Sequence, residues 1–125
     1  MTILPVIAVV DYGAGNLRSV AKALERSGMD VRVTDDPAIV RSAEGVVLPG
    51  AGAFADAMDR LRSRGLAEAI IESIEAKRPY LGLCLGLQVL FDESDEHGIN
   101  AGLGVLPGRV EKFPGTSETG ESLRV

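Results

Sequence analysis

The chain has 125 residues, of which 46% are hydrophobic and 25% charged, and its formal net charge is −5 with a pI near 4.8. This length predicts one domain with a real core, and the acidic balance argues against non-specific binding to nucleic acid. The longest apolar runs are too short to span a membrane. The single cysteine excludes an internal disulfide and the first residues lack the basic segment of a signal peptide, so we expect a cytoplasmic protein.

Apolar runs alternate with helical patterns over the first 91 residues of the chain. Continuous runs such as Val6–Val10 are typical of strands that are buried on both faces, and apolar residues spaced by three and four predict amphipathic helices. This alternation predicts a three-layer α/β fold, in which a mostly parallel sheet carries helices on both faces. The expected strands cover 6–10, 31–33, 45–48 and 80–83, and the expected helices cover 17–24, 37–40, 54–61, 66–74 and 85 to about 91.

Beyond Asp92 the alternation of apolar runs and helical spacing is weaker. We expect the acidic run Glu93–Glu96 to form a solvated turn, because its residues are all polar. Residues 105–113 are expected to supply one or two short strands around Pro107-Gly108. Residues 114–122 are polar and turn-like, and 123–125 look like the start of another strand.

The segment Gly82-Leu83-Cys84-Leu85-Gly86 follows an apolar run and contains the chain's one cysteine. It has the pattern of a nucleophile elbow, in which a strand ends, the chain turns sharply and a helix begins. Glycines on either side of the turn would relieve the crowding between strand and helix. The pattern predicts acyl transfer through the thiolate of Cys84, with the N–H of Leu85 directed at the oxyanion. The structural alternative is a small buried cysteine.

Two further glycine-containing turns follow predicted strands. Pro49–Gly52 is small enough for backbone N–H groups to approach a substrate, and its Ala51 or Gly52 amide is a candidate second oxyanion donor. At the turn 11–16, Gly13–Arg18 resembles a dinucleotide fingerprint with Asp35 at a suggestive distance, but Arg18 stands where the third glycine belongs, so an ordinary turn is the alternative. Because ligands bind at the carboxyl ends of parallel strands, we expect the three turns to converge there.

Two polar side chains near the elbow are candidates for a role in the same site. Gln88 lies four residues after Cys84 and so on the same face of the expected helix, where its amide can hydrogen-bond a polar substrate. The alternative is a partly buried surface glutamine. His97 is the sole histidine, but it stands in a polar loop beyond the elbow helix, so we do not expect it to reach the sulfur as a base.

The segments 11–16, 49–54 and 82–88 together resemble the class I, or triad, glutamine amidotransferases. Within that family they are most similar to the glutaminase subunits of imidazole glycerol phosphate synthase, from histidine biosynthesis. The resemblance covers nearly the whole chain, and it implies that residues 1–125 are the N-terminal portion of a single amidotransferase domain.

The resemblance implies a reaction and a set of site residues. Cys84 would attack the side-chain amide of L-glutamine, a glutamyl thioester would form, and ammonia would pass to a (βα)8-barrel cyclase subunit. No metal or organic cofactor is implied. The implied residues are Leu85 and Ala51 as backbone oxyanion donors, Gly50, Gly52 and Gln88 in substrate binding, and Tyr12 and Asn16 at the partner interface.

One departure from the family pattern concerns proton transfer. The family's catalytic histidine and glutamate lie in a C-terminal His-Pro-Glu motif, which this sequence does not contain. We therefore expect an N-terminal fragment that is inactive by itself, because removing a triad base costs several orders of magnitude. The alternatives are a non-catalytic docking module, the glutaminase domain of another amidotransferase, and a different thiol enzyme of this fold in which Asp11 assists Cys84.

Overall fold

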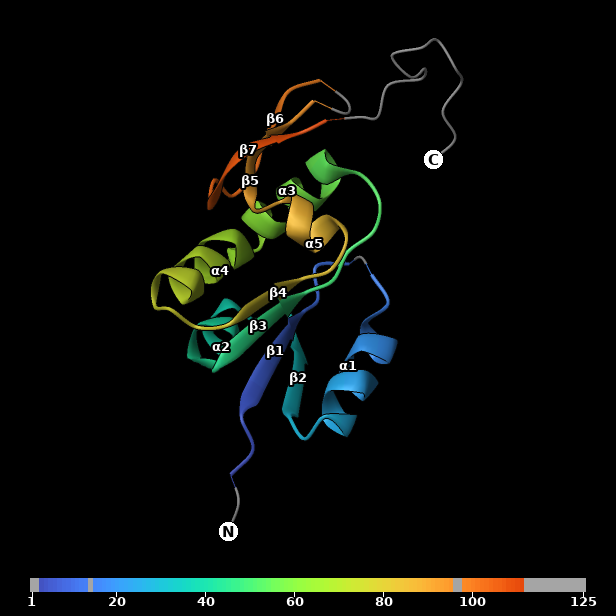
Figure 1. Ribbon diagram of the computed structural model, residues 1–125, viewed down its shortest axis with the longest axis vertical. Helices are drawn as coiled ribbons and strands as arrows, with labels where there is room; N and C mark the ends of the chain where they lie inside the picture. The colour runs from blue at the N-terminus through green and yellow to red at the C-terminus, as the bar shows by residue number, and fades with distance from the viewer. Residues whose placement is uncertain (1–2, 14, 96–97, 112–125) are drawn as a thin grey trace, which may run out of the picture.

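The computed structural model describes residues 3–13, 15–95 and 98–111, and its main feature is a parallel sheet (Figure 1). The strand order is β2-β1-β3-β4, and every neighbouring pair is parallel. The four predicted strands are confirmed, with β4 ending one residue earlier than expected. Their bounds are β1 Val6–Val10, β2 Asp30–Thr34, β3 Gly45–Leu48 and β4 Tyr80–Gly82.

Helices connect these strands and begin at the local signals that the sequence carries. The Asn16 side chain caps α1 by accepting from the N–H of Ser19 at 3.3 Å, and Asp36 caps α2 in the same way. Gly65, with a left-handed φ of 72°, separates α3 from α4. The helices are α1 Leu17–Arg26, α2 Pro37–Ser42, α3 Phe54–Ser63, α4 Leu66–Glu75 and α5 Leu85–Gln88.

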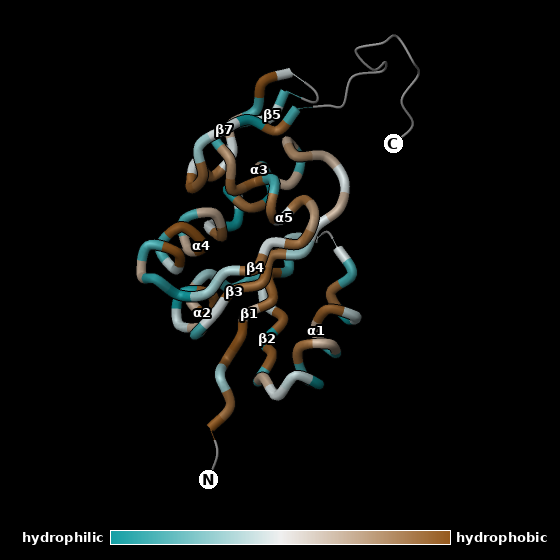
Figure 2. Tube along the Cα trace, in the orientation of Figure 1, coloured by the Kyte–Doolittle hydropathy of each residue, from teal (hydrophilic) through white to brown (hydrophobic). Residues whose placement is uncertain are grey.

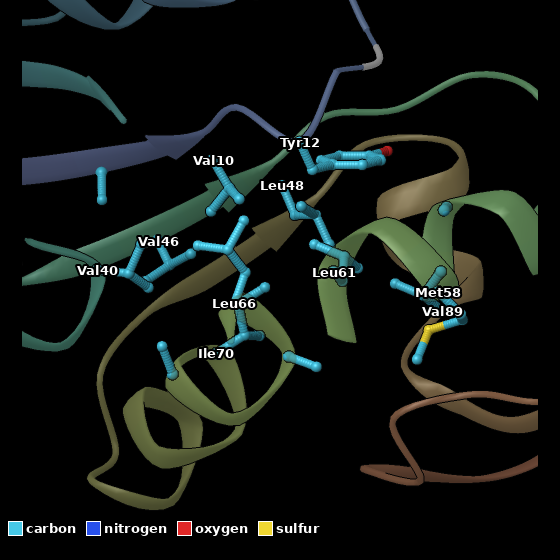
Figure 3. Packing of buried hydrophobic residues seen from close by; sticks show 14 of the residues in the cluster. Val10, Tyr12, Val40, Val46, Leu48, Met58, Leu61, Leu66, Ile70 and Val89 are labelled. Atoms are coloured by element: carbon cyan, nitrogen blue, oxygen red, sulfur yellow. The ribbon is translucent and has the colours of Figure 1, made fainter. Parts of the chain in front are cut away.

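The helices lie on both faces of the sheet, as the predicted three-layer fold requires. Figure 1 shows α1 on one side of the strands and α2 and α4 on the other. Alternate residues of β1 and β3 face the second side, where they pack against α2, α3 and α4 in the main core (Figure 3). This core includes Val10, Leu48, Val40, Leu61 and Ile70, each buried.

A second, smaller sheet follows α5, and here the structure differs from the expected end of the elbow helix and from the expected turn after Asp92. The elbow helix was expected to reach Phe91, but α5 ends at Gln88, because the chain tightens there and the N–H of Leu90 bonds to the Leu87 carbonyl at 3.2 Å. Phe91 then opens β5 (Phe91–Ser94), which pairs with β6 (Asn100–Ala101) and β7 (Leu106–Val110) in the order β6-β5-β7.

The acidic run after Asp92 is therefore not simply a solvated turn. Glu93 and Ser94 belong to β5, and Ser94 is buried. The charge of Glu93 has a partner in the neighbouring strand, because Arg109 of β7 contacts its carboxylate at 2.9 Å. Of the predicted segment 105–113, the structure describes 105–111, and there one strand, β7, runs through Pro107 and Gly108. The expectations for 114–125 lie outside the described residues.

Figure 2 shows the hydropathy of the chain along this fold, with β1 apolar over most of its length and α4 alternating between polar and apolar residues. That contrast matches a central strand covered on both faces and a surface helix covered on one. Within the described residues, every helix is too short or too polar for a membrane crossing.

Candidate active site

Cys84 stands at a strained turn between β4 and α5. Its backbone has φ 53° and ψ −112°, and only Lys77 shares a positive φ among the described non-glycine residues. Such a conformation costs about 1–3 kcal/mol, so the surrounding structure must hold it in place. The residue is exposed. The turn therefore presents a thiol at the carboxyl end of the parallel sheet, as a nucleophile elbow does.

The two elbow glycines allow strand, turn and helix to approach one another. A Cβ atom added to Gly82 would lie 2.6 Å from the carbonyl carbon of Gly86 and 2.7 Å from the nitrogen of Leu87. A Cβ atom on Gly86 would overlap the carbonyl oxygen of Leu48 in β3. Both contacts are with backbone atoms, which cannot move aside as a side chain can. The predicted steric role of these glycines is thus confirmed.

The first turn of α5 leaves one backbone amide available. The N–H groups of Leu87 and Gln88 bond to the Cys84 carbonyl at 2.9 and 3.2 Å, and that of Gly86 bonds to Leu83 at 3.0 Å. For the N–H of Leu85, the described part of the chain offers no hydrogen-bond partner. The first amides of a helix are free to bind a ligand oxygen. Gln88 is half-buried on the same helix.

The Pro49–Gly52 loop lies directly beside the elbow. The N–H of Leu83 donates to the carbonyl of Leu48 at 3.0 Å, which joins the end of β3 to the elbow. A Cβ atom on Gly50 would lie 3.2 Å from the Cβ of Leu85. Ala51 and Gly52 are exposed, and Gly52 has a left-handed φ of 101°. Gly50 of the loop therefore lies against Leu85, the first residue of α5.

The third turn, after β1, packs on that loop, so the three turns converge as predicted. A Cβ atom on Gly15 would lie 3.2 Å from the nitrogen of Gly50. Asn16 is exposed, but Tyr12 retains only 1% of its surface accessible and belongs to the core. The placement of Tyr12 and Asn16 at a partner interface stays a prediction. The Asp11 carboxylate accepts from the N–H of Gly13 at 3.1 Å, within its own turn.

Two tyrosines, the only two in the sequence, stand beneath this site. The Tyr80 hydroxyl donates to the carbonyl of Gly86 at 2.6 Å, a link that the sequence analysis missed. The available signal was a tyrosine in the apolar run just before the elbow, because the hydroxyl of a tyrosine that is buried needs a hydrogen-bond partner. Burial raises the pKa of Tyr80, and burial raises the pKa of Tyr12 to about 12 against the opposing charge of Arg60. Both hydroxyls therefore keep their protons at neutral pH.

Two further expectations concern groups around the elbow. His97, which we did not expect to act as the base, lies outside the described residues. No cluster of three or more potential metal ligands occurs within 3–13, 15–95 and 98–111.

An elbow thiol at the end of a parallel sheet, bordered by a glycine-rich loop, is an arrangement suited to acyl transfer. The profile of the class I glutamine amidotransferase family matches residues 8–119, and the chain belongs to that family.

Individual curated relatives show which members of the family the chain is similar to. The chain is 55% identical over 120 residues to the imidazole glycerol phosphate synthase subunit HisH of Syntrophotalea carbinolica, a match that covers 95% of this chain and 58% of the relative. It is 57% identical over 108 residues to the same subunit of Moorella thermoacetica, covering 86% of this chain and 51% of the relative. The chain thus spans a little over half the length of these curated relatives.

Solved structures agree on the fold. A crystal structure of a glutamine amidotransferase matches with a TM-score of 0.70 and 23% identity, over 83% of this chain and 55% of that one. A putative peptidase E protein from Listeria monocytogenes matches with a TM-score of 0.66 and 16% identity, over 82% of this chain and 63% of that one. At these identities the two matches show the fold alone.

Proposed function

We propose that this chain carries the nucleophile and the oxyanion site of a glutaminase, within a synthase that makes imidazole glycerol phosphate in histidine biosynthesis. The observation that carries the proposal is the strained elbow at Cys84, held between Gly82 and Gly86. The relatives named as HisH subunits support the choice of synthase. Residues 1–125 would form the N-terminal portion of one amidotransferase domain.

The proposed reaction uses the thiol that the elbow presents. The Cys84 thiolate attacks the side-chain carbonyl carbon of L-glutamine, the carbonyl π electrons move to oxygen, and a tetrahedral oxyanion forms. Collapse of that oxyanion breaks the C–N bond, and the nitrogen leaves as ammonia after taking up a proton. Water then attacks the glutamyl thioester, which releases glutamate and restores the thiol. The proton that the nitrogen takes up is the one that the thiol gave up to a general base, and water returns a proton to the sulfur when it opens the thioester. The proposal includes no metal or organic cofactor.

Backbone amides would stabilise the oxyanion. The N–H of Leu85 has no competing bond within the described residues, and we assign the second donor to Ala51 in the neighbouring loop. Gly50 and Gly52 would let the loop approach the substrate closely, and Gln88 would bind the glutamine on the exposed side of the sulfur. We assign proton transfer to residues outside this chain, because the family pattern places its histidine and glutamate in a C-terminal motif.

The ammonia would be used by a (βα)8-barrel cyclase subunit that docks as a heterodimer partner at the turn containing Asn16. The exposure of Asn16 and the contact of Gly15 with the Pro49–Gly52 loop support this position for the interface. We place the complex in the cytoplasm, in keeping with the biosynthetic role that the relatives' name describes.

The test is ammonia release from glutamine by the protein at its natural full length, measured with and without the cyclase subunit. We expect glutamine-dependent turnover with the partner, and a loss of at least about 10⁴-fold in Cys84→Ala, because removing a triad nucleophile leaves only residual catalysis. Turnover that survives in Cys84→Ala would contradict the assignment. The cysteine can be replaced without disturbing the core because it is exposed.

A further inference from the structure

Tyr12 lies where the turn after β1 meets the candidate active site. Its side chain is among the largest that are fully buried, and it belongs to the main core. Figure 3 shows the ring extending from the end of β1, with its hydroxyl directed toward the side on which α5 lies. The ring is therefore anchored in the core, while its polar end lies beside Gly50 of the Pro49–Gly52 loop.

The hydroxyl of Tyr12 fills the space beside Gly50. A Cβ atom added to Gly50 would overlap that hydroxyl oxygen, and it would lie 3.3 Å from the Cζ of the same ring and 3.2 Å from the Cβ of Leu85. Gly50 is not among the described glycines with positive φ, so its backbone conformation would suit alanine. What excludes a side chain at position 50 is the Tyr12 hydroxyl.

This contact is steric rather than ionic. The nearby Arg60 guanidinium is engaged with the carbonyl of Gly13 at 2.9 Å and with the carboxylate of Asp56 at 3.3 Å. Since burial raises the pKa of Tyr12 to about 12, the hydroxyl is neutral at physiological pH. It can therefore act as a fixed spacer between the loop and the elbow.

We propose that Tyr12 is a positioning residue whose hydroxyl sets the separation between the Gly50–Gly52 loop and the amide of Leu85. The inference rests on the glutaminase function proposed above. Two donors stabilise an oxyanion only when each lies about 2.7–3.1 Å from it. A loop that moved inward, or one pushed outward, would take the Ala51 amide out of this range. Because the oxyanion exists only in the transition state, such a shift lowers kcat and leaves KM for glutamine nearly unchanged.

A double-mutant cycle tests this role in the protein at its natural full length, assayed with its cyclase partner. Gly50→Ala should lower kcat by at least about 100-fold, since a lost oxyanion donor costs about 10²–10³-fold. Tyr12→Phe should lower kcat about three- to tenfold, because the spacer is shortened. The double variant should recover at least about tenfold over Gly50→Ala, since only the 3.2 and 3.3 Å contacts then remain.

The matched control replaces the other tyrosine. Tyr80→Phe should not rescue Gly50→Ala, because the Tyr80 hydroxyl bonds to Gly86 and not to the loop. If Gly50→Ala is insoluble, a double variant that is soluble and active counts as the recovery. The kcat of Tyr12→Phe alone can be measured in either case.

The outcomes separate this inference from the function on which it rests. A double variant as impaired as Gly50→Ala overturns the role of Tyr12, and so does recovery of folding stability without recovery of kcat. A wild-type protein that releases no ammonia, and takes no label at Cys84 from an electrophilic glutamine analogue, overturns the proposed function and with it this role.

Discussion

Tyr80→Phe is the substitution that most directly tests how the elbow is held. The Tyr80 hydroxyl donates to the carbonyl of Gly86 at 2.6 Å, and Gly86 is buried. No other donor to this carbonyl is found among the described residues. Phenylalanine keeps the packing of the ring but leaves a buried acceptor without a partner, which costs about 1–3 kcal/mol. We therefore expect the free energy of unfolding to fall by about 1–2 kcal/mol at neutral pH.

The assay is urea denaturation of the protein at its natural full length, with the midpoint compared at equal slope. Tyr12→Phe is the matched control, because it removes the other tyrosine hydroxyl, which contacts Gly50 and not the Gly86 carbonyl. The control should cost less than Tyr80→Phe. If Tyr80→Phe changes stability by under about 0.3 kcal/mol, or if the control costs more, the bond to Gly86 does not hold the elbow.

Three further predictions test other parts of the structure. Gly86→Ala should cost more than about 3 kcal/mol or abolish soluble expression, because its Cβ would overlap the Leu48 carbonyl; unfolding midpoints near wild type would contradict this. Burial raises the pKa of Tyr12 to about 12, whereas an unfolded tyrosine ionises near 10. The free energy of unfolding should therefore hold up to about pH 10 and fall by up to about 3 kcal/mol as the pH rises through 12. Absorbance at 295 nm follows the ionisation, and a Tyr12 hydroxyl that ionises near pH 10 would refute this prediction. Asn16→Ala should cost about 1 kcal/mol, since it removes the cap on the N–H of Ser19, and it should weaken cyclase binding in a titration; unchanged affinity would remove Asn16 from the interface.

The sequence was informative wherever one local signal determined one structural feature. The continuous apolar run Val6–Val10 is typical of a strand covered on both faces, and it is β1, a central strand. The paired glycines around Cys84 predicted the sharp turn, because their spacing is imposed by backbone contacts within a few residues. The convergence of three turns followed from parallel strand direction alone.

The sequence was misleading where distant residues decide. Glu93 appeared to belong to a solvated turn, but its partner Arg109 lies 16 residues further on, across β5 and β7. The polar turn that contains Tyr12 gave no signal that the core accommodates its ring beneath Gly50. The Tyr80 contact with Gly86 depends on how α5 folds back over β4. Such pairings arise from tertiary packing, which no periodicity records.

Covalent labelling of Cys84 is the most direct test of the central claim, that this thiol is the nucleophile of a glutaminase. The protein at its natural full length is incubated with an electrophilic glutamine analogue, and the adduct is located by intact-mass and peptide mass spectrometry. We predict one adduct at Cys84, formed at least about tenfold faster than with a generic thiol reagent of matched reactivity and slowed by added glutamine. If the generic reagent labels Cys84 while the analogue does not, or if glutamine gives no protection, the thiol is exposed but it is not in a glutamine site.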